Sequence, residues 1–359
     1  MHCYRLLLCI AVFSWTALSC SSFCLSKDGS VLFGKNYDWH VDAGYVIANK
    51  RTVEKVAIAE SNPATWVSKY GSVTFNQFGR EMPSGGMNEK GLVVELMWLS
   101  ETSYPAQDDR PAIGNLQWIQ YQLDNSATVE EVIARDADIR IAPRADADVH
   151  YLICDATGAC AAIESLHGKM VAHTGSDMPA KVLTNDTYEK SVAFLKKIRG
   201  YGGMLPMPND GSSHGRFVRL VHDMKKFSPK KARQNVKFAF NLLENVSAGD
   251  YTKWSIVYDV SEMAIHFHTF ERQKEKIIEM AKMNFLCTKP VYAIDINTTL
   301  EGDVSEQLIV YTPRRNRLLV DVVFSNVDFL AELDRSVWEE NWNYPKTTKC
   351  REGRGASVE

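Results

Sequence analysis

No charge of one sign dominates the sequence. Its 359 residues include 41 basic and 44 acidic side chains, which gives a net charge of −3. A protein that binds nucleic acid or another polyanion usually concentrates lysine and arginine on one surface. The composition therefore gives no support to a nucleic-acid partner. With 45% hydrophobic residues, the chain instead has the balance of an ordinary globular domain with a large core.

Long apolar runs are also absent after residue 18. The run at residues 6–18 is too short for a membrane span, because its residues rise about 1.5 Å each and a hydrocarbon core is roughly 30 Å thick. With Arg5 before it and Ala17-Leu18-Ser19 after it, this run is typical of a secretory signal peptide. We therefore expect cleavage between Ser19 and Cys20, which removes residues 1–19. The mature protein would be soluble, without stable membrane insertion, and either periplasmic or secreted.

Metal-binding patterns are missing too. The chain has eight cysteines, but neither a C-x-x-C motif nor the paired Cys/His spacing of a zinc site. Six cysteines remain once residues 1–19 are removed, and an oxidising compartment permits disulfides. Cys154 with Cys160 and Cys287 with Cys350 are candidate pairs, although spacing alone leaves the connectivity open.

Strand and helix patterns are both present, without a repeat or a low-complexity linker. Hairpins are expected around the Asp28-Gly29 turn and between residues 254–258 and 264–269. The expected helices are residues 113–123, 188–199 and 230–243. Ser228 is expected to cap the last of these, and Thr128 to cap a further short helix.

The order of these elements bears on the fold class. Strict βαβα alternation is absent, which argues against a doubly wound parallel sheet and favours hairpin-rich sheets covered by helices. We expect a single domain over residues 20–345. Residues 346–359 are polar and rich in small side chains, and we expect a loose tail there.

Cys20 would be the first residue of the mature chain, and this position gives it two chemical functions. Its free α-amine would have a pKa of about 7.7–8.0, which suits a base that works near neutral pH. A thiol with a reference pKa of about 8.5 beside that amine is a nucleophile with its own proton acceptor. One additional residue before Cys20 would turn the amine into an amide and remove the base.

Position alone leaves other roles open for Cys20. An N-terminal cysteine can be purely structural, form a disulfide, or carry the acyl group of a lipoprotein anchor. Lipoprotein signals usually have leucine three positions before the cysteine, where this sequence has Ala17. The residues that follow Cys20 favour catalysis.

Five segments resemble the choloylglycine hydrolase family, and they occur in the family's order. They are CSSFCL (20–25), GKNYDW (34–39), GMNEKGL (86–92), VLTN (182–185) and SSHGRFVR (212–219). The family contains N-terminal-nucleophile hydrolases such as conjugated bile salt hydrolases and penicillin V acylases. The resemblance covers residues 20–269. It implies an α+β fold, a four-layer αββα sandwich in which Cys20 begins a central strand.

The resemblance also implies roles for residues in these segments. Cys20 would be the nucleophile and its α-amine the base. Asp38 would hold the amine by a hydrogen bond, Asn185 would donate to the oxyanion, and Arg216 would lie beside the nucleophile. Asn88 would contribute to substrate binding.

Two positions depart from the bile salt hydrolase pattern. Lys35 stands where those enzymes usually have arginine, so the positive charge is kept but the planar fork of donors is lost. Trp98 stands where they have a second oxyanion-hole asparagine. Its indole N–H or a backbone group would have to replace that donor. We therefore count Lys35 among the catalytic residues and Trp98 as a wall of the substrate pocket.

The implied reaction is hydrolysis of a linear amide that joins a bulky apolar acyl group to a small amine, without a metal or organic cofactor. Three alternatives remain: an acyltransferase, an inactive binding protein of the same fold, and a lipoprotein acylated at Cys20. The expected partner is a small-molecule amide, and a homo-oligomer is compatible with the resemblance. Loops at residues 66–77, 98–111 and 199–213 are expected to select the acyl group.

Overall fold

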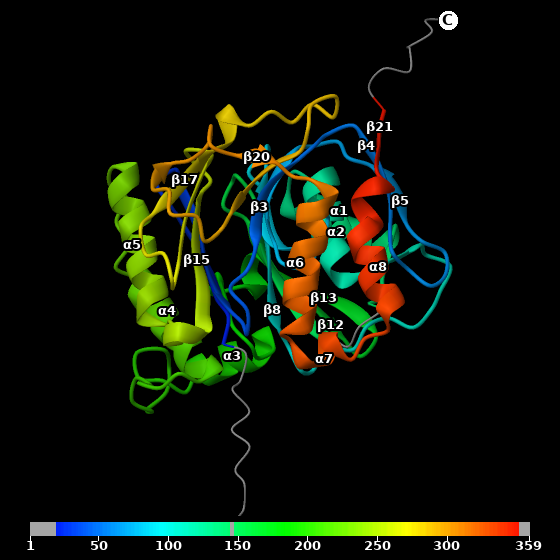
Figure 1. The fold of residues 1–359 in the computed structure, drawn as a ribbon. Coiled ribbons are helices and arrows are strands. Elements are labelled where there is room, and N and C mark those ends of the chain that lie inside the picture. Colours follow the sequence, from blue (N-terminus) through cyan, green and yellow to red (C-terminus); the bar gives the residue numbers. More distant parts are fainter. Residues whose placement is uncertain (1–18, 144–146, 352–359) are drawn as a thin grey trace, which may run out of the picture.

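The structure is a computed structural model, and it describes residues 19–143 and 147–351. Apart from Ser19, the expected signal peptide lies outside the described residues. Two large sheets packed face to face form the centre of the protein, and helices cover their outer faces (Figure 1). No helix of the described part is long and apolar enough to cross a membrane.

The first sheet carries the start of the expected mature chain. In spatial order its strands are β14 (Val182–Leu183), β1 (Ser21–Lys27), β2 (Ser30–Asp38), β15 (Thr252–Asp259), β16 (Ala264–Thr269), β17 (Lys276–Glu279) and β19 (Gly302–Asp303). All neighbours are antiparallel except β17 and β19. β1 therefore has a partner on each side, which fixes the position of its first residues.

The second sheet is antiparallel throughout. Its strands, in spatial order, are β13 (Lys169–Thr174), β12 (Cys160–Leu166), β11 (Val149–Cys154), β8 (Val93–Trp98), β7 (Pro83–Asn88), β6 (Ser72–Asn76), β3 (Tyr45–Asn49), β18 (Tyr292–Asp295) and β20 (Ile309–Val310). Short strands lie outside both sheets: β9 (Ala112–Ile113) with β10 (Arg140–Ile141), and β21 (Lys349–Cys350) with β4 (Val53–Val56) and β5 (Thr65–Val67).

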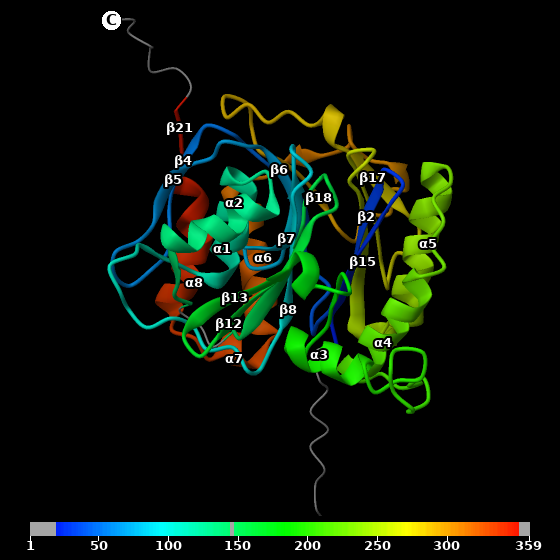
Figure 2. The ribbon, with the colours of Figure 1, turned by 180° about the vertical axis from the view of Figure 1, so that it is seen from behind.

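Helices form the outer layers. Those on the side of the first sheet are α4 (Ser213–Met224) and α5 (Ala232–Asn245), and those on the side of the second are α1 (Asn115–Asn125) and α2 (Val129–Ala134) (Figures 1 and 2). α3 (Tyr188–Leu195) lies at one end of the sandwich, where it packs against α4 and its Tyr188 N–H donates to Glu164 of β12. Single 3-10 turns occur at Arg135–Ala137, Gly175–Asp177, Gly249–Tyr251, Met280–Lys282 and Tyr344–Lys346. The protein is thus the expected α+β four-layer αββα sandwich.

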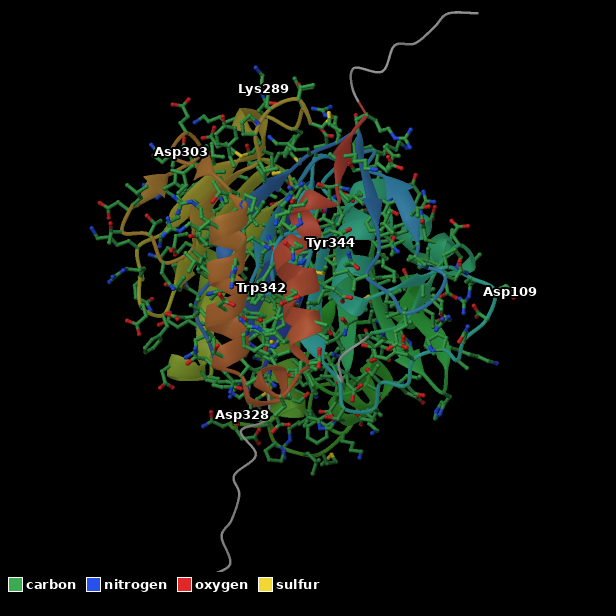
Figure 3. All side chains as sticks on the ribbon, turned by 45° about the vertical axis from the view of Figure 1, so that its right-hand side comes forward. Asp109, Lys289, Asp303, Asp328, Trp342 and Tyr344 are labelled. Atoms are coloured by element: carbon green, nitrogen blue, oxygen red, sulfur yellow. A yellow bond between two sulfur atoms is a disulfide. The ribbon has the colours of Figure 1, made fainter. Side chains whose placement is uncertain are left out.

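Three further helices follow the sandwich in sequence. They are α6 (Pro313–Ser325), α7 (Asp328–Ala331) and α8 (Arg335–Asn343), and we call them together the C-terminal cap. Figure 1 shows α6 and α8 side by side across the face turned to the viewer. Trp342 of α8 packs against the guanidinium of Arg317 on α6, whose Cζ lies 4.4 Å from its ring centroid, and Figure 3 shows Trp342 between the two helices. The sequence patterns did not predict these helices.

Both expected hairpins are present, and the first has a clear local cause. Asp28 and Gly29 have φ angles of +49° and +80°, a backbone that suits an Asp-Gly two-residue turn. β1 and β2 then pair from Lys27 and Ser30 back to Ser21 and Asn36. This register brings the start of β1 level with the end of β2.

The expected helices differ from the structure at their ends. α1 begins at Asn115, because Ile113 pairs with Ile141 in a short parallel bridge. α3 ends at Leu195, four residues early. α5 begins at Ala232 and Ser228 is not its cap, since the Asn235 side chain bonds the backbone of Lys230 instead.

Other local predictions can be checked directly. Thr128 caps α2 by accepting from the Glu131 backbone N–H at 3.2 Å. Both candidate cysteine pairs, Cys154 with Cys160 and Cys287 with Cys350, are disulfides. The segment expected to be a loose tail is anchored in part: Lys349 and Cys350 pair with β4, and the second disulfide ties Cys350 to the body. Residues 352–359 lie outside the described part.

Candidate active site

Cys20 lies immediately before β1 and lines a large cavity, with 3% of its surface exposed. Its Sγ lies 3.7 Å from the backbone carbonyl of Asp38, to which it donates. Burial raises the pKa of the Cys20 thiol, and the charges of Lys35 and Arg216 oppose that effect. In the structure Cys20 is still bonded to Ser19, so its nitrogen is an amide.

Asp38 ends β2 and is fully buried beside Cys20. Neither of its carboxylate oxygens makes a well-aligned hydrogen bond to another described residue. Burial raises the pKa of Asp38, opposed first by the hydroxyl of its cross-strand neighbour Thr252 and then by the charges of Arg216 and Lys35. A buried acceptor without an aligned donor is costly, so this carboxylate can accept a further hydrogen bond.

Arg216 connects Cys20 to Asn185 by hydrogen bonds. It lies on the first turns of α4, whose N-cap Ser212 accepts from the Gly215 N–H. One guanidinium nitrogen donates to the carbonyls of Ser19 and Cys20 and, at 2.7 Å, to the Ser21 hydroxyl. The other donates to Oδ1 of Asn185 at 2.9 Å. One nitrogen thus holds residues 19–21 and the other holds Asn185.

Asn185 is fixed from three directions. Its Oδ1 accepts from Arg216, its Nδ2 donates to the Trp98 carbonyl at 2.9 Å, and its backbone N–H donates to the Ser213 hydroxyl at 2.9 Å. His150, which the sequence gave no reason to select, supports the residue before it. The imidazole lies 2.7 Å from the Thr184 carbonyl and 3.1 Å from the Glu164 carboxylate.

Trp98 forms a wall of the cavity, but its polar group points elsewhere. The indole N–H donates to the Ser100 hydroxyl at 3.3 Å, and only the backbone carbonyl contacts Asn185. The ring centroid lies 6.5 Å from that of Phe329, which in turn lies 6.3 Å from Trp39. Trp98 therefore acts here as an aromatic surface and not as a donor into the site.

Lys35 and Asn88 lie in different surroundings, one between the two sheets and the other in a turn away from the cavity. Lys35 is completely buried, and its ammonium donates to the Leu96 carbonyl on β8, so it bridges the two sheets. Asn88 does not line the cavity. Its amide donates to the carbonyls of Leu123 and Ser126, and its Oδ1 accepts from the backbone N–H groups of a turn. The structure thus brings Cys20, Asp38, Asn185, Arg216 and Lys35 together and leaves Asn88 in a structural turn.

The cavity beside Cys20 is lined mostly by apolar side chains and opens to solvent. The sandwich contributes Trp39, Phe78, Met82, Leu96, Trp98 and Val149, and the C-terminal cap contributes Phe324, Phe329, Leu330, Leu333 and Val337. Of the three loops expected to select the acyl group, Trp98 is the only described residue that lines this cavity. The cap supplies that surface instead. Figure 3 shows Asp328 of α7 at the lower end of the cap.

The four-layer αββα sandwich places the chain in the fold class of the N-terminal-nucleophile hydrolases. Residues 20–293 match the linear amide C–N hydrolases of the choloylglycine hydrolase family, and the chain belongs to that family. It is therefore a hydrolase that acts on carbon–nitrogen bonds of linear amides. The match ends before the C-terminal cap.

Individual relatives agree with this assignment. A penicillin V acylase from Pectobacterium atrosepticum is 26% identical over 260 residues, which cover 61% of this chain and 69% of that protein. A solved penicillin V acylase from Agrobacterium tumefaciens has a TM-score of 0.71 and 27% identity, over 82% of this chain and 98% of its own. The conjugated bile acid hydrolase of Clostridium perfringens shares the fold, with a TM-score of 0.65 and 21% identity over 78% of this chain and 98% of its own.

Proposed function

We propose that the protein is an exported amidase in which Cys20, freed by cleavage after Ser19, attacks amides of bulky apolar acids. The observation that carries the proposal is the place of Cys20 at the wall of an apolar cavity, beside the buried Asp38 carboxylate. Cleavage would create an α-amine next to that carboxylate, and the pair would supply the base and its anchor.

The proposed reaction begins when the amine accepts the Cys20 proton and the thiolate adds to the amide carbonyl. One hydrogen of the Asn185 side-chain amide is bonded to the Trp98 carbonyl, so the second hydrogen would donate to the oxyanion. The α-ammonium then protonates the leaving amine, which departs and leaves a thioester on Cys20. Water, deprotonated by the same amine, hydrolyses the thioester and releases the acid.

The cavity indicates which part of the substrate it would bind. Its apolar walls favour an uncharged acyl group, since burial of apolar surface stabilises a complex by about 25 cal/mol per Å². Penicillin V and a conjugated bile acid, the compounds in the relatives' names, both join a bulky apolar acid to a polar amine. We therefore place the acyl group against the cap and the amine toward the mouth.

Two measurements test this function. Intact mass of the protein isolated after export should correspond to a chain that begins at an unmodified Cys20. The same protein should hydrolyse at least one member of a panel of phenoxyacetyl, bile acid and fatty acyl amides. An added acyl mass on Cys20, or a retained Ser19, would contradict the proposed nucleophile. Release of the acyl group only onto an added amine would identify an acyltransferase instead.

A further inference from the structure

Three buried cysteines from the two sheets bring their sulfur atoms together, away from the cavity beside Cys20. Cys24 lies on β1 of the first sheet, while Cys154 ends β11 and Cys160 begins β12 of the second. Their Sγ atoms all lie within 4.8 Å of one another, and none of the three residues is more than 3% exposed. We call these three residues the sulfur cluster. None of them lines the cavity.

Two of the three sulfurs are already joined. Cys154 and Cys160 face each other across the β11–β12 hairpin and form a disulfide, whereas Cys24 is a free cysteine. A buried free cysteine usually packs as a small hydrophobic side chain, and its neighbours decide whether it does more. Here the neighbour is a disulfide, which is the group that a thiolate attacks. Both reactants of a disulfide exchange are therefore present side by side.

Backbone contacts hold Cys24 against the hairpin that carries the disulfide. The Cys24 backbone N–H donates to the Lys181 carbonyl at 2.9 Å. The Lys181 ammonium in turn donates at 2.6 Å to the carbonyl of Gly158, which lies in the turn of the β11–β12 hairpin. A Cβ atom at Gly158 would come within 2.1 Å of the Ser26 hydroxyl on β1. The turn thus packs directly against β1, and this packing fixes the distance between Cys24 and the disulfide.

We propose that the sulfur cluster is a disulfide-exchange site, in which Cys24 replaces either Cys154 or Cys160 as a disulfide partner. The chain would then have a second disulfide arrangement, and this arrangement would link β1 to the β11–β12 hairpin by a covalent bond. The two sheets of the sandwich would be cross-linked four residues beyond Cys20. The inference concerns only the disulfides, so it does not depend on amide hydrolysis.

The exchange needs no oxidant or reductant. The thiolate of Cys24 attacks one sulfur of the disulfide, and a new S–S bond forms as the old one breaks. The electron pair of the broken bond goes to the other cysteine, which leaves as a thiolate and takes up the proton that Cys24 lost. One disulfide and one thiol are present before and after the step.

The two arrangements differ in the loop that the disulfide closes. The present bond joins residues that are 6 apart in sequence. A bond from Cys24 to the hairpin would close a loop that contains β2 to β8. A longer loop loses more entropy when the unfolded chain is cross-linked, so the second arrangement should stabilise the folded protein more.

Burial makes the exchange slow near neutral pH. It raises the pKa of the Cys24 thiol to about 12, opposed by the charge of Lys181 and reinforced by that of Asp155. Only the thiolate attacks a disulfide, so few molecules react at any moment. At pH 9 the thiolate of a group with this pKa is about a hundred times more abundant than at pH 7, and exchange should be correspondingly faster.

The first test traps the second arrangement. Cys154→Ser leaves the thiols of Cys24 and Cys160, and Cys160→Ser leaves those of Cys24 and Cys154. Because Cys20 lies on the same tryptic peptide as Cys24, both variants are made in a Cys20→Ala background. The folded proteins are treated with oxidised glutathione, alkylated after an acid quench and mapped by peptide mass without reduction. At least one variant should carry an internal disulfide to Cys24 in most molecules, and its oxidised form should melt several degrees above its reduced form.

The second test needs neither serine variant to fold. Cys20→Ala protein with all other cysteines intact is held at pH 9 without oxidant and mapped in the same way. A fraction of the molecules should have Cys24 in a disulfide, and Cys154 or Cys160 alkylated in its place.

The other disulfide provides a matched control. Cys287→Ser in the same Cys20→Ala background frees Cys350, which is not part of the sulfur cluster, and after treatment with oxidised glutathione Cys24 should show no bond to Cys350. A Cys24 that stays free in both serine variants would overturn the proposal, as would the absence of exchange at pH 9. Pairing of Cys24 with Cys350 to the same extent would also overturn it, because the bond would then not depend on the cluster.

Discussion

The cavity has two opposite walls of different chemistry. One wall, formed at the start of β1 and the end of β2, carries Cys20 and Asp38, and Arg216 bonds the Cys20 carbonyl beside it. The other is the C-terminal cap, which contributes mostly apolar side chains together with Glu340 and Asn341. The first wall lies inside the residues that match the family and the second lies beyond them. We infer that the chemistry is shared with the family, and that the cap adapts this chain to its own acyl group.

The largest expected effect concerns the wall that carries Cys20. Cys20→Ala should reduce amide hydrolysis by at least about 10⁴-fold, the usual scale for removing a nucleophile. The melting temperature should change little, because the change removes one sulfur atom. Cys20→Ser should be almost as inactive, since a hydroxyl is far harder to deprotonate than a thiol.

Steady-state rates with a substrate from the panel provide the measurement, and circular dichroism provides the control for folding. Substantial hydrolysis by either variant would mean that another residue attacks the amide. The wall that carries Cys20 would then lose its proposed role, whereas the cap would keep its own.

The next effect concerns the oxyanion donor. Asn185→Ala should lower kcat by about 10²–10³-fold, as for other oxyanion-hole donors. The acyl group does not depend on Asn185 for its contacts, so KM should change much less. Asn185→Asp offers a matched control of the same size, and it should be at least as impaired because a carboxylate repels the oxyanion. A change in KM alone would place Asn185 in substrate binding.

A substitution in the C-terminal cap should act on binding of the acyl group, whereas Asn185→Ala acts on kcat. Phe329 lies between Trp39 and Trp98 at the cavity wall. Phe329→Ala should lower kcat/KM for a bulky apolar amide by about tenfold, the scale of lost contacts in an apolar pocket. Acetyl amides, which are too small to reach the cap, should lose less. Leu318→Ala, an exposed position on the outer side of α6, serves as the control, and equal losses for both amides would show that the cap does not select the acyl group.

Sequence reasoning succeeded where local patterns carry the information. The Asp28-Gly29 turn predicted the β1–β2 hairpin, and the hairpin register brings Cys20 to Asp38. The spacing of Asn185 and Arg216 could be matched to the family one residue at a time. These positions depend on turns and caps that a few neighbouring residues determine.

The rest depends on contacts between distant segments. α7 is separated from Cys20 by almost the whole chain, so nothing near Cys20 in sequence indicates that Phe329 lines the same cavity. Glu95 could have been noticed as a charge within an apolar strand, but Tyr258, whose hydroxyl bonds it, comes from another strand. Asn88 belongs to a family segment, yet its hydrogen bonds serve a turn. A segment match therefore did not distinguish a structural role from a role in binding.

The smallest expected effect on catalysis comes from the disulfide that closes the cap onto the body. Cys287 and Cys350 are 63 residues apart, and the loop between them contains all three cap helices. Replacing both with serine should lower the free energy of unfolding by about 2–4 kcal/mol, because a longer loop gains more entropy in the unfolded chain. Since Cys20, Asn185 and Arg216 lie outside this loop, kcat should stay nearly constant, while KM for bulky amides should rise modestly as the cap loosens. Denaturant unfolding and steady-state kinetics measure the two effects, and a large fall in kcat would show that the two walls of the cavity are coupled.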